Sequence, residues 1–257
     1  MSKAPAVDYA LQIIECFAMQ SKDLGIADIS NTLGINKNAV SRVLEALLEQ
    51  NWIFLSDEVQ KKYRLTMRPF SLINRNWENY EIAKIAAPSV EKLNAALGDS
   101  TYFGIKNGDH VLYAIHCNST KTVRINGCTG GEYPLNCAAP GKVLLSYCSS
   151  DEIKTYFNHK RDKETDNTIT DYDTFMKQAE EIKEQRYAVD NEEFAKGIIC
   201  IAVPVFDCSG NVAAAVGISS LTLYDDISSL IEKKLPLIQK TADEISANLG
   251  YVKYTFA

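Results

Sequence analysis

The chain has 257 residues, of which 46% are hydrophobic, and its formal net charge at pH 7 is −6. This length exceeds what one typical domain needs, so we expect one large or two smaller domains with a substantial buried core. The composition excludes a disordered or fibrous chain, and no apolar run is long enough to cross a bilayer. A net negative charge also argues against a protein that coats nucleic acid over its whole surface.

The charge is unevenly distributed. Residues 1–75 hold nine Lys/Arg and eight Asp/Glu, whereas the remainder holds eighteen and twenty-five. A near-neutral N-terminal part before an acidic one suits nucleic-acid binding by the N-terminal part alone. The first residues lack the apolar core and cleavage pattern of a signal peptide, so we expect a cytoplasmic protein without a membrane partner. The seven Cys and three His lack zinc-site spacing, which predicts reduced thiols, no metal and no cofactor.

The N-terminal pattern predicts three helices, over residues 5–19, 26–33 and 37–50. Pro5 suits the first turn of the first helix. Gly34 lies between the second and third helices, where a turn requires a positive φ or a close approach. The apolar side of the first helix is predicted to consist of Val7, Leu11, Ile14 and Phe17.

The third helix is amphipathic, with Asn36 as its expected N-cap. Its apolar stripe should pack on Ile26, Ile29 and Leu33 of the preceding helix. Most amphipathic helices only cover a protein surface, but a helix-turn-helix of this spacing fits the major groove of DNA. The apolar stripe comprises Val40, Val43, Leu44, Leu47 and Leu48, and the predicted DNA-contacting face comprises Lys37, Asn38, Ser41 and Arg42.

A short hairpin follows this helix pair. Residues 52–54 and 62–65 are expected to be its strands, and residues 56–61 its polar tip. Lys61, Lys62 and Arg64 would lie along this wing beside the phosphate backbone. Residues 1–66 are therefore predicted to form a winged helix-turn-helix domain.

The remainder is predicted to be an α+β domain with a mostly antiparallel sheet, over residues 87–250. Residues 67–97 are predicted to be mostly helical, with Pro69 opening a helix and Pro88 interrupting or restarting one, and a helical linker over 67–86 is expected. Asn107-Gly108 marks a hairpin turn, and a further strand is expected within 120–128. Helices are expected over 139–147, from 151, over 172–185 and over 224–249, two buried strands over 198–207 and 211–220, and a tail over 251–257.

Two segments carry a family resemblance. They are YPLNCAAPGKVLLSY at residues 133–147 and RYAVDNEEFAKGIICIAVPVFDCSGNVAAAVGISS at residues 186–220. Together with the helix-turn-helix, they make the chain similar to the isocitrate lyase regulator (IclR) family of transcriptional regulators. The resemblance implies a GAF-like effector domain after the DNA-binding head, and a homodimer through the heads or a homotetramer. It also implies a small metabolite as effector, commonly an organic acid, a sugar acid or an aromatic compound.

The resemblance further implies the effector-site residues. It places the ligand against the backbone at Ala138, Ala139 and Gly141, where the start of a helix can receive an anion, with Asp190, Cys200 and Ser219 lining the pocket. The chain departs from the family pattern by having Asn136 where the family has His, and Pro140 where a small residue is usual.

Each of these residues also has a purely structural interpretation. The alternatives are core packing for Cys200, a turn cap for Asp190, an ordinary strand end for Ser219 and close packing for Gly141. Lys142 can be an anion ligand, but it is expected to be a solvated helix residue.

Three functions compete. A ligand-controlled transcription factor, with repression as the expected sign, would bind a palindromic double-stranded operator. An enzyme acting on a small metabolite would need a nucleophile and base, whereas Glu180-Glu181 and Glu192-Glu193 read as solvated pairs and no catalytic motif occurs. An architectural protein with a vestigial head is disfavoured by Arg42 and the basic wing.

Overall fold

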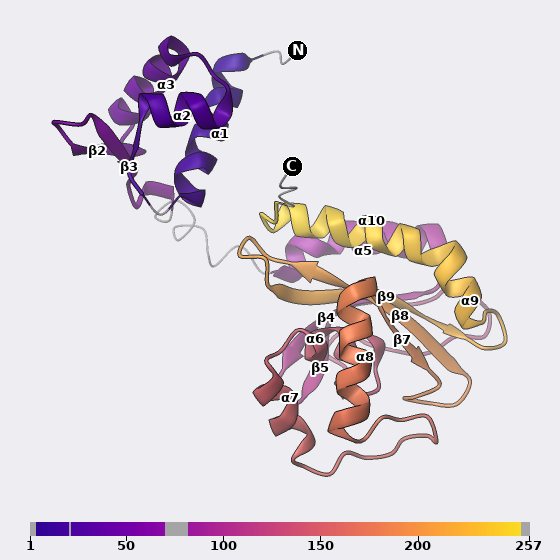
Figure 1. Cartoon of the computed structure of the whole chain (residues 1–257). Helices are drawn as coiled ribbons and strands as arrows, with labels where there is room; N and C mark the ends of the chain where they lie inside the picture. The colour runs from indigo at the N-terminus through magenta and orange to yellow at the C-terminus, as the bar shows by residue number, and fades with distance from the viewer. Residues whose placement is uncertain (1–3, 21, 70–81, 253–257) are drawn as a thin grey trace. The chain divides into compact units, whose positions relative to one another are not determined.

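The computed structural model describes residues 4–20, 22–69 and 82–252, and Figure 1 shows the chain. The chain divides into two compact units, Met1–Tyr80 and Glu81–Ala257. Most of the predicted linker over 67–86 lies outside the described residues. Among the described residues, no helix has the length and apolar character needed to cross a membrane.

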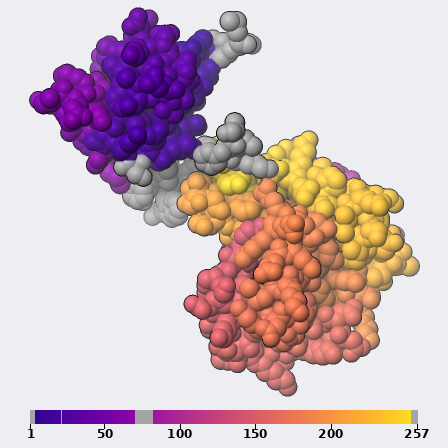
Figure 2. Space-filling model, viewed as in Figure 1, coloured from indigo at the N-terminus to yellow at the C-terminus, as the bar shows by residue number. Residues whose placement is uncertain are grey.

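The N-terminal unit contains three helices and a small sheet. Helix α1 spans Pro5–Met19, α2 spans Ile26–Leu33 and α3 spans Lys37–Glu49. The predicted α3 stripe is buried in one cluster with Ile29 and beside Ile26 and Leu33, as expected. Strands β2 (Ile53–Asp57) and β3 (Lys62–Leu65) form the predicted wing, which projects from this unit in Figure 2. Strand β1 (Leu24–Gly25) pairs with β3 and was not predicted from the sequence.

Helix ends in this unit follow the local sequence. The Asn36 side chain accepts a hydrogen bond from the Ala39 amide at 2.9 Å, which confirms the predicted N-cap. Gly34 has a φ of +68°, the left-handed conformation that ends α2. The expected apolar side of α1 is partly wrong, because Val7 and Leu11 remain 58% and 56% exposed. Phe17 does pack on α2 and α3 as predicted, together with Ile13 and Cys16, which were not predicted.

The C-terminal unit is built on a six-stranded antiparallel sheet with the strand order β6-β5-β4-β9-β8-β7. Strands β4 (Ser100–Asn107) and β5 (His110–Cys117) form the predicted hairpin, and β6 (Glu132–Pro134) pairs with β5. Strands β7 (Ala188–Asn191), β8 (Ile198–Phe206) and β9 (Val212–Leu221) complete the sheet. The α+β prediction is confirmed.

Helices cover both faces of this sheet, as Figure 1 shows. Helix α5 (Ile82–Leu97) and α10 (Leu235–Asn248) pack on one face through a core of branched apolar residues. Helices α6 (Ala139–Ser146), α7 (Ser150–Phe157) and α8 (Tyr172–Gln185) cover the other face. Because side chains alternate between faces along a strand, Ile199 and Ile201 face the α10 layer while Cys200 and Ala202 face the α6 layer.

Three local expectations for this unit are wrong. Residues 120–128 form no strand: Val123 is exposed, so the apolar alternation there has no buried face. Pro88 lies inside α5 without ending it. The expected final helix over 224–249 is divided into α9 (Ile227–Ser229), a π-helical turn (Leu230–Lys234) and α10.

Candidate functional site

The polar face of α3 is accessible in the N-terminal unit. Lys37, Asn38 and Arg42 are exposed and Ser41 is half-buried, while Val40 and Val43 on the opposite face are buried. The Ser41 hydroxyl donates to Glu45 Oε1 at 3.4 Å, one turn further along the same face. Asn and Arg can form paired hydrogen bonds with base edges, and Lys and Ser can hold phosphates. The arrangement can therefore enter a major groove with its polar groups outward.

The predicted basic residues of the wing have different surroundings. Lys61 is exposed at the tip with a φ of +51°, and Lys62 is half-buried at the start of β3. Arg64 is exposed, but its Nε donates to Asp23 Oδ1 at 2.6 Å. Lys61 and Lys62 can thus approach a phosphate directly, whereas Arg64 shares its charge with a carboxylate.

The predicted effector residues lie together on the α6-side face of the sheet. In the strand register Asp190 is opposite Cys200, Cys200 is opposite Ser219, and Ser219 is opposite Ser100. The four side chains therefore form one row across β7, β8, β9 and β4, which we call the polar row. Cys200 Sγ and Ser219 Oγ are 3.1 Å apart. Ser100 was not predicted as a site residue, because its place depends on a strand register that the sequence does not display.

Asp190 is almost completely buried at one end of the polar row. Its Oδ1 accepts hydrogen bonds from the backbone amides of Glu193 at 2.7 Å and Phe194 at 3.2 Å, so it does cap a turn. Burial raises the pKa of this carboxyl to about 7, against the effect of these hydrogen bonds. Burial also raises the pKa of the Cys200 thiol well above its ordinary value, so this thiol stays protonated.

Lys142 is fully buried, which contradicts the expectation of a solvated lysine. Its Nζ lies 2.5 Å from Oε1 of Glu193, which is itself only 5% exposed. The interpretation of Glu192-Glu193 as a solvated pair is therefore wrong for Glu193. A lysine is buried only when its charge is paired, because moving an unpaired ammonium out of water costs much free energy. The partner of Lys142 is 51 residues further along the chain, so no local sequence pattern shows this pair.

The start of α6 lies beside this ion pair. Ala138 is the N-cap, and Ala139 and Gly141 are buried in the first turn. A Cβ added to Gly141 would lie 2.7 Å from Leu135 Cα and 2.8 Å from Pro134 O, so close packing is one role of this glycine. Pro140 has no N–H, which leaves fewer backbone donors for an anion at this helix start.

Aromatic rings lie beside the polar row, because Tyr102 is close enough to interact with Cys200 and Asp190. Tyr102 stacks on Tyr113 with 4.8 Å between ring centroids, and Tyr113 contacts Tyr133 at 4.4 Å. Phe194, which follows β7, lies edge-on to Tyr133 on β6 at 5.3 Å, although β7 and β6 are opposite edges of the sheet. A hollow that reaches Ser219 has a volume of only about 10 Å³, which is room for one water.

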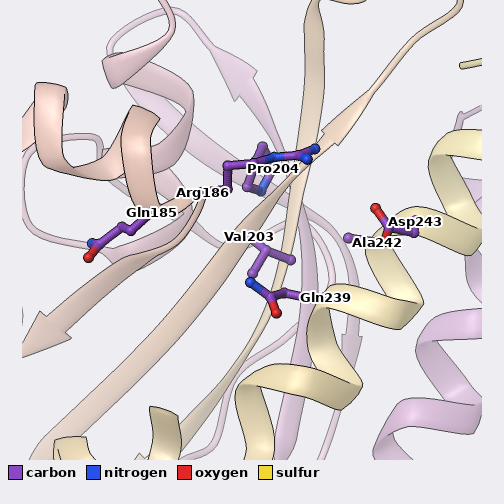
Figure 3. A pocket seen from close by; sticks show the side chains of 7 residues that line it. All are labelled: Gln185, Arg186, Val203, Pro204, Gln239, Ala242 and Asp243. Atoms are coloured by element: carbon purple, nitrogen blue, oxygen red, sulfur yellow. The ribbon is translucent and has the colours of Figure 1, made fainter. Parts of the chain in front are cut away.

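Larger hollows lie elsewhere. Figure 3 shows one of about 220 Å³ between the end of α8, strand β8 and α10, where Arg186 and Asp243 are among the lining residues. It contains none of the predicted effector residues. In the N-terminal unit a hollow of about 490 Å³ lies between α1 and α3 and is mostly apolar. Arg42 lines part of it, together with Tyr9 and Trp52.

Asn136 has a structural role. Its side chain is buried, donates to Ile169 O at 2.7 Å and accepts from the Tyr156 hydroxyl at 2.7 Å. The first bond attaches the chain before α6 to the loop before α8, and the second attaches it to α7. This polar residue is thus satisfied within the protein.

Comparison with known proteins places both units in one family. The C-terminal domain of IclR bacterial transcriptional regulators matches residues 75–247, and the IclR helix-turn-helix domain matches residues 6–53. The DNA-binding transcriptional repressor YiaJ of Escherichia coli K12 is 32% identical over 247 residues, covering 94% of this chain and 86% of YiaJ. The structure of an IclR-type regulator from Silicibacter sp. TM1040 superposes with a TM-score of 0.85 at 18% identity over 96% of each chain.

A structure of the C-terminal part alone is also similar. The inducer-binding domain of PobR from Acinetobacter, a double mutant in complex with 3-hydroxybenzoic acid, is 27% identical with a TM-score of 0.59. The match covers 63% of this chain and 96% of that domain. The chain belongs to the IclR family, as a DNA-binding transcriptional regulator whose C-terminal domain binds a small-molecule effector.

Proposed function

We propose that a homodimer of this chain represses transcription by binding a palindromic operator, and that a metabolite in the C-terminal unit controls this binding. The observation that carries the proposal is the outward polar face of α3, opposite a buried apolar stripe. The residues that contact DNA are Lys37, Asn38, Ser41 and Arg42 on α3, and Lys61, Lys62 and Arg64 on the wing.

The effector occupies the α6-side face of the sheet in this proposal. It contacts Asp190, Cys200 and Ser219 of the polar row, and the backbone at Ala138, Ala139 and Gly141. An organic acid or sugar acid suits a site that combines a helix start with buried polar side chains. The effector must bind the DNA-binding state and the DNA-free state with different affinities, and this difference in affinity drives the response.

The homodimer is proposed to form through the N-terminal unit, where α1 exposes Val7 and Leu11 beside the apolar hollow. An enzymatic function is disfavoured by the protonated state of the buried Cys200 thiol, since a nucleophilic cysteine needs its thiolate. We place the protein in the cytoplasm, where an operator is accessible.

The test begins with an operator, selected from a random duplex library by the wild-type protein. Arg42→Ala should reduce affinity by about 1–3 kcal/mol and relax preference at one base position, because a paired contact to a base edge is lost. Lys62→Ala should weaken binding to all sequences alike and reduce its salt dependence, because a phosphate contact is lost. Fluorescence anisotropy at several salt concentrations measures both effects.

Lys154→Ala is the matched control, since it removes one exposed positive charge from α7 of the other unit. It should leave operator binding unchanged. Wild-type affinity and salt dependence in both Arg42→Ala and Lys62→Ala would remove the groove-docking interpretation.

A further inference from the structure

The buried ion pair between Lys142 and Glu193 uses only part of its hydrogen-bonding capacity. Among the described residues, the Lys142 ammonium has one hydrogen-bond partner, Glu193 Oε1. Within the described part of the chain, the second carboxylate oxygen of Glu193 is buried and accepts no hydrogen bond. An ammonium offers three donors, and each carboxylate oxygen accepts. The pair thus retains donors and an acceptor that a bound molecule can use.

Glu193 cannot move away easily, because its backbone is held on both sides. Its amide donates to Asp190 Oδ1 at 2.7 Å, and its carbonyl accepts from the Thr168 hydroxyl at 2.6 Å and the Thr165 hydroxyl at 3.2 Å. Lys142 is held equally well, since it belongs to the buried helix α6. The two charges therefore face each other from fixed backbones, next to the end of the polar row.

The charges of this site limit what can bind there. Lys142 is the only cation among the effector-site residues named above, and Glu193 already neutralises it. Asp190 contributes a second carboxyl, whereas the buried thiol and hydroxyl of the polar row are neutral. A carboxylate that enters is attracted by Lys142 and repelled by Glu193 at short range, in surroundings that screen charge poorly.

We propose that Lys142 receives the carboxylate of an acidic effector, and that Glu193 is an internal competitor that holds this lysine while the site is empty. This inference rests on the proposed function, because it assumes that the effector occupies the polar row. Glu193 then sets how tightly carboxylates bind. Neutral ligands of the same shape do not depend on this competition.

The test is Glu193→Gln, which preserves the shape of the side chain and removes its charge. Gluconate, lactate and benzoate serve as probes, each compared with its neutral amide. Thermal-shift titration and calorimetry should show that at least one carboxylate binds the variant on the order of tenfold more tightly than wild type, because repulsion is removed and the lysine is released. The amides should bind both proteins alike.

Two further variants make the result specific. Glu164→Gln removes an exposed acidic charge near the site without a contact to Lys142, and should leave carboxylate binding as in wild type. The double variant Lys142→Met/Glu193→Gln replaces the pair by uncharged side chains, which buried sites often tolerate. It should lose carboxylate binding. It also provides the comparison with wild type if Glu193→Gln alone does not fold.

The inference is overturned if no carboxylate gains affinity in Glu193→Gln, if the amides gain equally, or if the double variant binds carboxylates as wild type does. The proposed function fails in a different way. In that case, saturating the wild-type protein with a probe that it binds would leave its operator affinity unchanged, whatever the order of affinities among the variants.

Discussion

Asp190 combines two roles that conflict at neutral pH. Its carboxyl caps the turn that positions Glu193, and a capping carboxylate is favoured in its charged form. Its burial favours the neutral form more strongly and raises the pKa to about 7. A site residue that titrates near the pH of the cell can couple ligand binding to proton binding.

This raised pKa predicts how stability changes with pH. An unfolded aspartate has a pKa of about 3.9, so between about pH 4 and pH 7 the folded protein retains a proton that the unfolded chain releases. The contribution of Asp190 to the free energy of unfolding therefore falls as pH rises through this window, and stays at its lowest value above it. Asp190→Asn removes this dependence while keeping an oxygen that accepts both amide bonds.

Urea unfolding of both proteins at pH 5 and pH 8 checks this prediction. The free energy of unfolding of Asp190→Asn minus that of wild type should increase from pH 5 to pH 8, by at most about 1.4 kcal/mol per unit of pKa difference. Comparing the two proteins cancels the contributions of groups that do not interact with Asp190. A difference that stays constant between the two pH values would show that Asp190 keeps an ordinary pKa.

At this scale the sequence was informative for some residues and misleading for others. Asp190, Cys200 and Ser219 were recognised through the family resemblance, and the structure places them in one row, although their contact with an effector remains a prediction. Lys142 and Glu193 were misjudged because each looks solvated in its own segment. Only tertiary structure brings them together, and a buried charge can be recognised only with its partner.

Among the elements, α6 positions the site by its close approach to the chain before it. The Cβ that alanine would add at Gly141 meets backbone atoms of Pro134 and Leu135, at 2.7–3.0 Å. Backbone atoms cannot rotate away, as the end of a flexible side chain can. The helix therefore depends on this glycine for its distance from residues 134–135.

Gly141→Ala should destabilise the protein by about 1–3 kcal/mol, because α6 must shift outward to relieve the overlap. The same shift moves Lys142 relative to Glu193, so probe binding should weaken as well. Thermal melting and titration with a carboxylate measure the two effects. Gly25→Ala is the control, since its added Cβ has no neighbour closer than 3.5 Å. Unchanged melting of Gly141→Ala would contradict the packing argument.

The elements show why periodicity predicted some segments and failed for others. Strands β8 and β9 lie in the middle of the sheet, where both faces are covered, and their continuous apolar runs were correctly interpreted. Residues 120–128 instead alternate between polar and apolar side chains, but β6 already pairs with β5. Lys121 and the Val123 amide contact Asp225 and Tyr224. Alternation predicts a strand only where a free edge and a covering layer exist.

At the scale of the whole molecule, the division of labour follows the charge distribution. The near-neutral first 75 residues contain the DNA-reading helix, and the acidic remainder is disfavoured as a DNA surface. The sequence predicted this organisation well, because each unit has its own apolar core and local motifs. It did not predict which apolar residues of α1 stay outside the core, since Val7 and Leu11 fit the helical stripe equally well.

The exposure of Leu11 gives the dimer its test. If α1 pairs with a second copy, Leu11→Glu places an uncompensated charge in an apolar interface, and at the symmetry axis it can face the same charge on the partner. Losing the burial of one leucine alone removes about 1.5–3 kcal/mol per subunit. The mass measured by light scattering at micromolar concentration should therefore fall to that of one chain. Operator affinity should also fall, because two linked DNA-binding units bind a palindrome more tightly than one unit does.

Gln12→Glu is the matched control for this prediction. It adds the same charge to the next residue of α1, which is exposed and points away from the Leu11 side, so the assembly should persist. If Leu11→Glu retains the wild-type mass while Gln12→Glu behaves identically, α1 is not the contact between subunits. A lowered operator affinity without a change in mass would instead place Leu11 near the DNA, since dissociation could then not account for the loss.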